Sequence, residues 1–261
     1  MKKVMVLVLF GLLLPVSTTV ADECQKVGVL KLRNPSSSPV EEVSLWKLKR
    51  SGETAFFFRS GMSIDADGAP KAYHPMSANG LDARGNAGKP GNWWALVTEN
   101  GKSSGKPIVQ KATDPAPGFY VSTTSLEDPS VDSKDPRRYV NAEAINFFVL
   151  PGRSALGTKL GDLGVIIRPA TGAYDYAIYA DVGPANKIGE GSIALASALG
   201  IPSSPKTGGT AHGIIFIVFP QTTAGWPLSQ PEIDQYGAQL FVKWGGVDKA
   251  KECFPQLEWN S

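Results

Sequence analysis

Two acidic residues stand out by their spacing and their surroundings. Asp181 follows the apolar stretch 176–180, and Glu190 comes nine residues later between two glycines. Gly183 and Pro184 in the intervening segment favour a reversal of the chain. Two carboxyl groups at the mouth of a fold can cleave a glycosidic bond, because one protonates the leaving oxygen while the other activates water or attacks directly. We therefore take Asp181 and Glu190 as candidate catalytic residues.

A purely structural role for the two acids is the alternative. The sequence predicts a helix over residues 190–199, with stop signals at Gly200 and Pro202. A negative charge in the first turn of such a helix is favoured by its dipole, and this would explain Glu190 without any chemistry. Asp181 could equally begin a turn. Spacing alone leaves both interpretations open.

A resemblance to a known family favours the catalytic interpretation. Residues 177–183 (AIYADVG) and 188–196 (IGEGSIALA) resemble the catalytic segment of glycoside hydrolase family 75, the fungal-type chitosanases. In that family, an aspartate after an apolar strand and a glutamate nine positions later are the two essential acids. The resemblance therefore implies that Asp181 and Glu190 are the catalytic pair. Outside the quoted motifs the chain departs from the fungal members, which suits a divergent, bacterial branch and leaves the substrate less secure than the family.

A second motif lies more than a hundred residues upstream. Residues 62–69 contain Asp65-Ala-Asp67-Gly68-Ala, which is similar to an Asp-x-Asp-Gly-Ala stretch in the same family. Asp and Gly also dominate tight turns, so a turn between strands is the structural alternative. A calcium loop of the EF-hand type is not indicated, since its longer series of ligands is missing. If Asp65 and Asp67 line the cleft, they would attract the ammonium groups of chitosan.

The segment around Asp181 also resembles, more loosely, the Ala-x-Asp-x-Gly loop of double-psi β-barrel hydrolases that cut cellulose or peptidoglycan. By that analogy Asp181 is the general acid and Glu190 the general base of an inverting reaction, with the opposite assignment still open. The fold expected from the resemblance and from the strand pattern is mainly β. We predict a single-domain, double-psi-like β-barrel with a short helix after the catalytic loop and a C-terminal helix.

The elements that must position these residues are short strands, because glycine and proline are scattered and long helical periodicity is absent. Residues 54–58 and 93–97 are solidly apolar, as strands buried on both faces would be. A capping box at Ser229 and Glu232 predicts a helix that ends at Gly245. The remaining predicted strands cover residues 28–32, 43–49, 118–123, 145–150, 164–167, 176–180 and 213–219.

Several other side chains are candidates for substrate binding. His74 could line the cleft or serve a structural role, and Tyr179 is one of several aromatic residues that could stack on a sugar. Trp93 and Trp94 are adjacent, so in a strand their rings would point to opposite faces, and one could belong to the core while the other stacks on a sugar. Most aromatic residues of a domain this size belong to its core.

The sequence predicts neither a metal ion nor a cofactor. His74 and His212 are the only histidines, which argues against a zinc site, and no serine lies in a Gly-x-Ser-x-Gly elbow. The two cysteines, Cys24 and Cys253, lie near opposite ends of the chain. In an oxidising compartment we expect them to form one disulfide, the alternative being two unpaired thiols.

The N-terminal region predicts export. Residues 1–21 have two lysines, an apolar run and a small-residue cleavage site, as signal peptides do, so residues 22–261 would form the catalytic domain of a secreted or periplasmic protein. Without Lys2 and Lys3, 24 basic residues balance 24 acidic ones, which does not indicate a nucleic-acid partner. No further segment looks membrane-spanning.

These observations predict a monomeric enzyme that hydrolyses the β-1,4 glucosamine linkages of chitosan or a related amino-sugar polymer. Two alternatives remain open at this point. One is a hydrolase of peptidoglycan or another polysaccharide, and the other is a glycan-binding envelope protein without catalytic activity.

Overall fold

The structure, a computed structural model, describes residues 23–32, 41–152 and 157–260. The predicted signal peptide, residues 1–21, lies outside the described residues. Three α-helices occur in this part of the chain: α1 (Ile193–Ala198), α2 (Gln230–Trp244) and α3 (Gly246–Cys253). The strands are β1 (Cys24–Leu32), β2 (Glu41–Leu48), β3 (Phe56–Asp65), β4 (Gly88–Lys89), β5 (Asn92–Trp93), β6 (Phe147–Pro151), β7 (Leu163–Arg168), β8 (Ala173–Gly183), β9 (Glu190–Ser192) and β10 (Thr210–Phe219).

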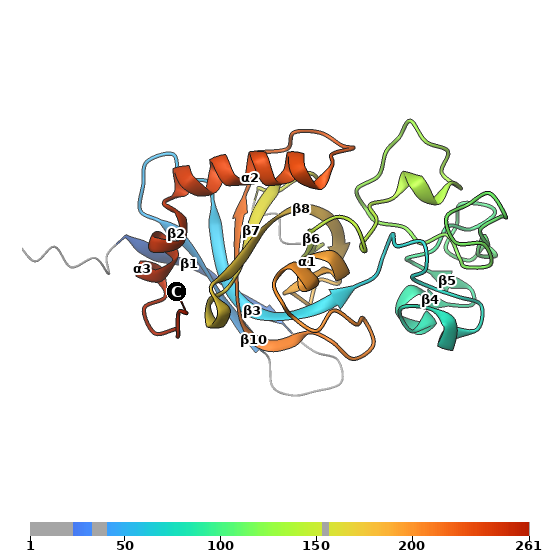
Figure 1. The fold of residues 1–261 in the computed structure, drawn as a ribbon, viewed down its shortest axis with the longest axis horizontal. Helices are drawn as coiled ribbons and strands as arrows, with labels where there is room; N and C mark the ends of the chain where they lie inside the picture. The colour runs from blue at the N-terminus through green and yellow to red at the C-terminus, as the bar shows by residue number, and fades with distance from the viewer. Residues whose placement is uncertain (1–22, 33–40, 153–156, 261) are drawn as a thin grey trace, which may run out of the picture.

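Six of these strands close into a barrel (Figure 1). The order is β3, β10, β7, β8, β6 and β9, and β9 pairs again with β3 to complete the ring. The β6–β8 and β3–β9 pairs are parallel, whereas the other pairs are antiparallel. The hairpin of β1 and β2 extends the sheet from β3. The prediction of a mainly β, single-domain barrel is confirmed.

The three consecutive phenylalanines of β3 show why its sequence is apolar on both faces. Phe56 and Phe58 point into the barrel, where Phe58 stacks on Phe216 with ring centres 4.9 Å apart. Phe57 points outward and meets Trp244 and Phe254 at 5.5 and 5.7 Å. Complete burial of a side chain of this size contributes about 2–3 kcal/mol. The barrel therefore has an inner core and an outer one.

The C-terminal helices cover that outer face (Figure 1). Helix α2 begins with the predicted capping box of Ser229 and Glu232 and ends at Gly245, beyond which α3 follows. The disulfide between Cys24 and Cys253 ties β1 to α3, as predicted, with Cα atoms 5.5 Å apart. Within the described residues, no helix combines the length and the hydropathy that crossing a membrane requires.

Residues 66–146 form a long connection from β3 to β6 that lies beside the barrel (Figure 1). Two strand predictions here are wrong. In the stretch 93–97 only Trp93 belongs to a strand, and Trp94 is 61% exposed. Residues 118–123 make isolated bridges, such as Val109 with Tyr120, and no named strand. Trp93, Leu96 and Tyr120 pack against the outside of β6 and β8, whereas Val97 and Val121 form a separate small cluster with Tyr139. Burial here therefore does not require a regular sheet.

The predicted helix over residues 190–199 begins later than expected. Glu190 to Ser192 form β9, because β6 on one side and β3 on the other pair with their backbone. Helix α1 starts at Ile193, and Ser192 caps it by accepting a hydrogen bond from the Leu195 amide. Glu190 therefore sits on a strand, and the helix dipole does not explain it.

Candidate active site

A β-bulge directs Asp181 to the outside of the barrel. Along the β6–β8 pair, Phe148 is opposite Tyr179 and Val149 is opposite Asp181, so Ala180 is an extra residue in β8. Side chains alternate between faces along a strand, and without the extra residue Asp181 would share the inner face with Tyr179. The Leu126 amide donates to the Ala180 carbonyl at 2.8 Å, which satisfies the bulged backbone.

Glu190 reaches the same face from the other side of β6. In β9 it is paired with Val149 of β6 and with Ser63 of β3. The preceding Gly189 has φ +83°, and a Cβ there would lie 2.3 Å from Ser60 Oγ and 2.5 Å from the Gly61 carbonyl oxygen. Its own carbonyl accepts from the Ser63 amide at 2.9 Å. Only glycine allows β9 to approach β3 this closely.

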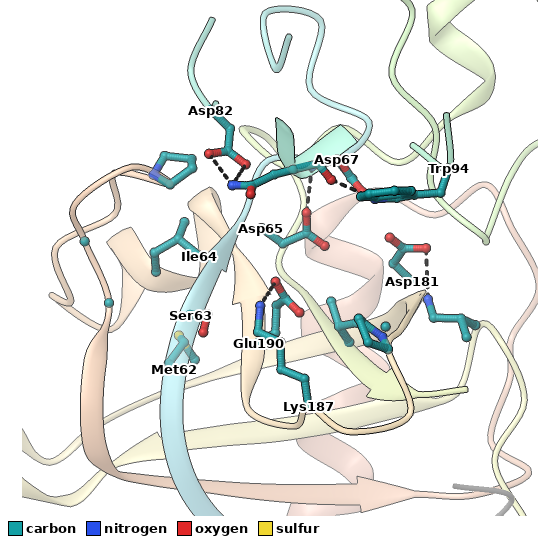
Figure 2. Close-up of a pocket in the computed structure, with 18 of the residues that line it drawn as sticks. Met62, Ser63, Ile64, Asp65, Asp67, Asp82, Trp94, Asp181, Lys187 and Glu190 are labelled. Atoms are coloured by element: carbon teal, nitrogen blue, oxygen red, sulfur yellow. Dashed lines mark hydrogen bonds and ion pairs between the residues drawn. The ribbon is translucent and has the colours of Figure 1, made fainter. Parts of the chain in front are cut away.

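The two acids thus flank Val149 in one row across three strands. Because neighbouring strands lie about 4.8 Å apart, the Cα atoms of Asp181 and Glu190 are about 10 Å apart. Both residues line an open cavity of about 1010 Å³. Figure 2 shows the carboxyl groups of Asp65, Asp181 and Glu190 directed toward the same space. The structure therefore brings together the two residues that the sequence singled out.

Asp181 is held through one of its two carboxyl oxygens. Oδ1 accepts hydrogen bonds from the Ser125 amide at 2.8 Å, the Ser125 hydroxyl at 2.5 Å and the Val182 amide at 2.9 Å. Burial raises the pKa of Asp181, the bonds from Ser125 and Val182 oppose this, and nearby Glu190 adds to the rise. Desolvation dominates because it penalises the charged form.

Glu190 is paired with a lysine from the turn that precedes it. Lys187 Nζ lies 2.8 Å from Oε1 of Glu190, whose side chain is 15% exposed. Lys187 is the single basic residue among the described residues that line the cavity, against five acidic ones: Asp65, Asp67, Asp82, Asp181 and Glu190. Acidic side chains therefore outnumber basic ones in the cavity lining.

Asp65 and Asp67 add two further carboxyl groups to the cavity wall. Asp65 ends β3 and is 8% exposed, and its Oδ1 accepts from the Asp67 amide at 2.7 Å. Tyr73 donates its hydroxyl to Asp67 Oδ1 at 2.7 Å. Burial raises the pKa of both aspartates well above the usual range, and the neighbouring carboxylates add to the effect. Burial, followed by the Asp67 charge, also raises the pKa of Tyr73.

The turn after Asp65 depends on one glycine. Gly68 has φ +76°, and a Cβ there would lie 2.0 Å from the Val140 carbonyl oxygen. Its amide donates to Ser122 Oγ at 3.1 Å, which joins the turn to a later part of the long connection. The Asp-x-Asp-Gly motif is thus both a turn and part of the cavity wall, which combines the two interpretations that the sequence left open.

Carboxyl oxygens of Asp65, Asp67 and Asp181 lie within 4.8 Å of one another, a spacing that could hold a cation. Hard cations such as Ca²⁺ prefer oxygen ligands, but Ca²⁺ takes six to eight of them. Protons are the other way to relieve repulsion among the three, and the raised pKa values of all three point in that direction.

Two predicted binding residues lie away from the cavity lining. His74 accepts from the Met76 amide through Nδ1 at 3.0 Å, and its ring packs edge-on against Phe119. Tyr179 is 6% exposed and stacks on Phe148 inside the barrel. Neither belongs to the residues that line the cavity. His74 is a turn residue, and the bulge that turns Asp181 outward leaves Tyr179 in the inner core.

Ser125 and Lys187 also contribute to the site and were not identified from the sequence. Ser125 lies 56 positions from Asp181, in a loop without regular structure, and no sequence pattern marks it. The position of Lys187 in the turn between the two acids was a weak indication that it lies near the site. Trp93 and Trp94 were recognised as an adjacent pair, of which one was expected in the core and the other as a possible stacking surface for a sugar, without a choice between them. The structure buries Trp93 and leaves Trp94 in the cavity.

Comparison with known proteins finds no matching family model and no significantly similar curated protein.

Proposed function

We propose that the protein is an exported, endo-acting glycoside hydrolase of the family 75 chitosanase type, which cleaves β-1,4 glucosamine linkages. The observation that carries this proposal is the placement of Asp181 and Glu190 on either side of Val149, on the wall of one open cavity. The strand between them sets a Cα separation of about 10 Å. This separation is compatible with an inverting reaction, in which the two carboxyl groups are about 6.5–9.5 Å apart.

The surroundings of the two acids support different roles. Burial raises the pKa of Asp181, which favours a protonated acid. Its Oδ1 accepts three hydrogen bonds, so the proton belongs on Oδ2. Glu190 forms an ion pair with Lys187, which is the arrangement of a carboxylate. We therefore assign Asp181 as the general acid and Glu190 as the general base.

In this mechanism, the water oxygen attacks the anomeric carbon while Glu190 takes a proton from the water. The bond from the anomeric carbon to the glycosidic oxygen breaks, and Asp181 passes its proton to that leaving oxygen. Val149 forms the apolar floor between the two acids, with 4% exposure. All atoms of the reaction come from water, the substrate and the two carboxyl groups.

The carboxyl groups of the cavity favour a cationic polymer. The cavity lining has five acidic residues and one lysine. Chitosan has an ammonium group on each deacetylated sugar, and a nearby cation lowers the pKa of a carboxyl group, so Asp65 and Asp67 would ionise beside chitosan and attract it. The carboxylates of peptidoglycan would have the opposite effect. Hydrolysis of peptidoglycan is the second candidate, because that polymer also has β-1,4-linked amino sugars. Reducing-end release from chitosan, chitin, glucan and purified sacculi separates these candidates.

The central test replaces each acid by its amide. Asp181→Asn and Glu190→Gln should each lower kcat on chitosan by at least about a hundredfold, since acid–base groups contribute about 10²–10⁴ to the rate. Asp128→Asn and Glu99→Gln are matched controls, because both residues are outside the cavity lining. Full activity in either cavity variant would refute the assignment. Substrate binding without hydrolysis by the unmodified protein would favour a glycan-binding protein.

A further inference from the structure

One wall of the cavity presents a tryptophan that the catalytic argument does not use. Trp94 is 61% exposed and lines the same cavity as Asp181 and Glu190. In Figure 2 its ring is seen nearly edge-on beside Asp67 and Asp181, so one face of the indole is turned toward the carboxyl groups. A large aromatic side chain exposed in an open cavity is typical of a ligand-binding site.

The indole ring is held in place by a chain of hydrogen bonds. Trp94 Nε1 donates to the Asn86 carbonyl oxygen at 2.8 Å. The Asn86 amide donates in turn to both carboxyl oxygens of Asp82, each at 2.9 Å. Asp82 is 5% exposed and also accepts from the Ala83 amide at 2.7 Å. The indole N–H is therefore already satisfied, and the π-face is the part of the ring available to a ligand.

Trp93 anchors this segment on its other side. It is 6% exposed and packs in the core between the barrel and the long connection, with its ring centre 6.5 Å from that of Tyr120. The Trp94 amide donates to the Ala87 carbonyl at 3.1 Å. The backbone under Trp94 is thus fixed, and the ring would lose little conformational freedom when a ligand binds.

The chemistry of the cavity identifies the ligand. A pyranose ring has an apolar C–H face that matches an indole face, and an ammonium group is attracted by the negative face of an aromatic ring. The acidic residues opposite Trp94 add a second attraction for that ammonium. An amino-sugar ring satisfies all three features, and a cavity of about 1010 Å³ is at the upper end of ligand sites, as a chain of several sugars needs.

We propose that Trp94 is the stacking platform of a glucosamine subsite next to the catalytic pair, and that Asp82 and Asn86 position its ring. This inference rests on the proposed function for the identity of the polymer. It assigns to Trp94 the binding of a sugar beside the bond that is cut, and no part in the transfer of protons.

The test measures binding in a protein that cannot hydrolyse the ligand. With Glu190→Gln as the background, calorimetric titration with fully deacetylated glucosamine hexamer gives the reference Kd. Adding Trp94→Ala should raise Kd by about tenfold, which is the size expected for a desolvated cation–π and stacking contact. Trp94→Phe keeps a ring and should restore most of the affinity. Tyr236→Ala removes an exposed aromatic residue of α2 outside the cavity and should leave Kd unchanged.

The outcomes separate this inference from the proposed function. The proposal that Trp94 is a stacking platform would be refuted by unchanged hexamer affinity in Trp94→Ala, or by no hexamer binding in the Glu190→Gln background. Weakened binding in Trp94→Ala together with no hydrolysis by the unmodified protein would support the stacking role of Trp94 and refute the proposed hydrolase activity. In the active protein, Trp94→Ala should raise KM and leave kcat within about threefold, because uniform binding affects KM alone. Thermal unfolding curves should confirm that every variant is folded.

Discussion

At the scale of single residues, the pKa of Asp181 depends on burial and on the hydrogen bonds that its carboxyl oxygen Oδ1 accepts. The Ser125 amide and hydroxyl both donate hydrogen bonds to Oδ1 of Asp181. The same hydroxyl oxygen accepts a hydrogen bond from the Val182 amide at 3.2 Å. These bonds stabilise the carboxylate, whereas burial favours the neutral acid. The balance between the two effects decides the pH range in which Asp181 can donate a proton.

We predict that Ser125→Ala moves the alkaline limb of the kcat/KM profile to higher pH. The variant loses the hydroxyl bond that lowers the pKa of Asp181, so this pKa should rise further. If Asp181 is the general acid, it then keeps its proton to higher pH, and the alkaline limb of kcat/KM should move upward. The profile of kcat/KM against pH on chitosan measures this. An upward shift of the acidic limb instead would identify Asp181 as the base.

Ser130→Ala provides the matched control for this experiment. Its hydroxyl donates to Asp128 Oδ1 at 2.7 Å, so the same kind of bond is removed on an exposed loop outside the cavity. Its pH profile should overlay that of the unmodified protein. Loss of activity in Ser125→Ala with both limbs unmoved would show a structural role for Ser125 and contradict the electrostatic one.

At the scale of elements, two local departures from regular structure build the cavity wall that carries Asp181 and Glu190. The bulge at Ala180 turns Asp181 outward, and the three-residue strand β9 inserts Glu190 between β6 and β3. Both acids are thereby fixed on paired strands, with the turn 184–189 joining them. Bulges commonly re-aim a side chain at a functional site, and β8 is an example.

Gly189→Ala should damage this wall more than a similar change elsewhere. A Cβ at Gly189 would meet Ser60 and Gly61 at less than 3 Å, and the backbone has φ +83°. We expect a loss of about 2–4 kcal/mol in the free energy of unfolding, from backbone strain and overpacking together. Urea unfolding gives this number, and the chitosan assay should show reduced activity because Glu190 is displaced.

Gly213→Ala separates the effect of backbone strain from that of overpacking. Gly213 has φ +89°, close to that of Gly189, but a Cβ there would have nothing within 4 Å. The variant should lose only about 1–2 kcal/mol, from the left-handed backbone alone. Equal losses in the two variants would show that β9 has room to relax away from β3, contrary to the prediction.

At the scale of the whole molecule, the disulfide joins the two ends of the described chain. Cys24 and Cys253 are 229 positions apart, and the bond holds β1 against α3 on the outside of the barrel. Neither cysteine lines the cavity. The disulfide therefore restricts the unfolded chain and lies away from the cavity lining.

Replacing both cysteines by serine should lower stability without changing the chemistry. The loop-closure argument for a loop of this length gives about 5 kcal/mol, which corresponds to a fall in Tm of about 10 °C or more for a chain of this size. Calorimetry of the double variant measures the fall, and treating the unmodified protein with a reductant should reproduce it. At 25 °C the activity on chitosan should be retained. A Tm unaffected by either treatment would contradict this account.

Local sequence signals determined much of the framework. The alternation and apolar runs of β1, β2, β6, β7, β8 and β10, the capping box of α2 and the pairing of Cys24 with Cys253 were all predicted. These features depend on neighbouring residues or, for the cysteines, on there being only two. The candidate pair Asp181 and Glu190 was also found locally, because its signal is a spacing within one segment.

The tertiary structure alone decided how these parts make a site. Strand pairing with β6 and β3 made Glu190 part of a strand, although its own sequence resembles the start of a helix. The register of β8 against β6 decided that Asp181 faces the cavity while Tyr179 faces the core. Ser125 and Trp94 come from a connection whose path depends on packing against the barrel. Such contacts join residues far apart in the chain, and no local pattern encodes them.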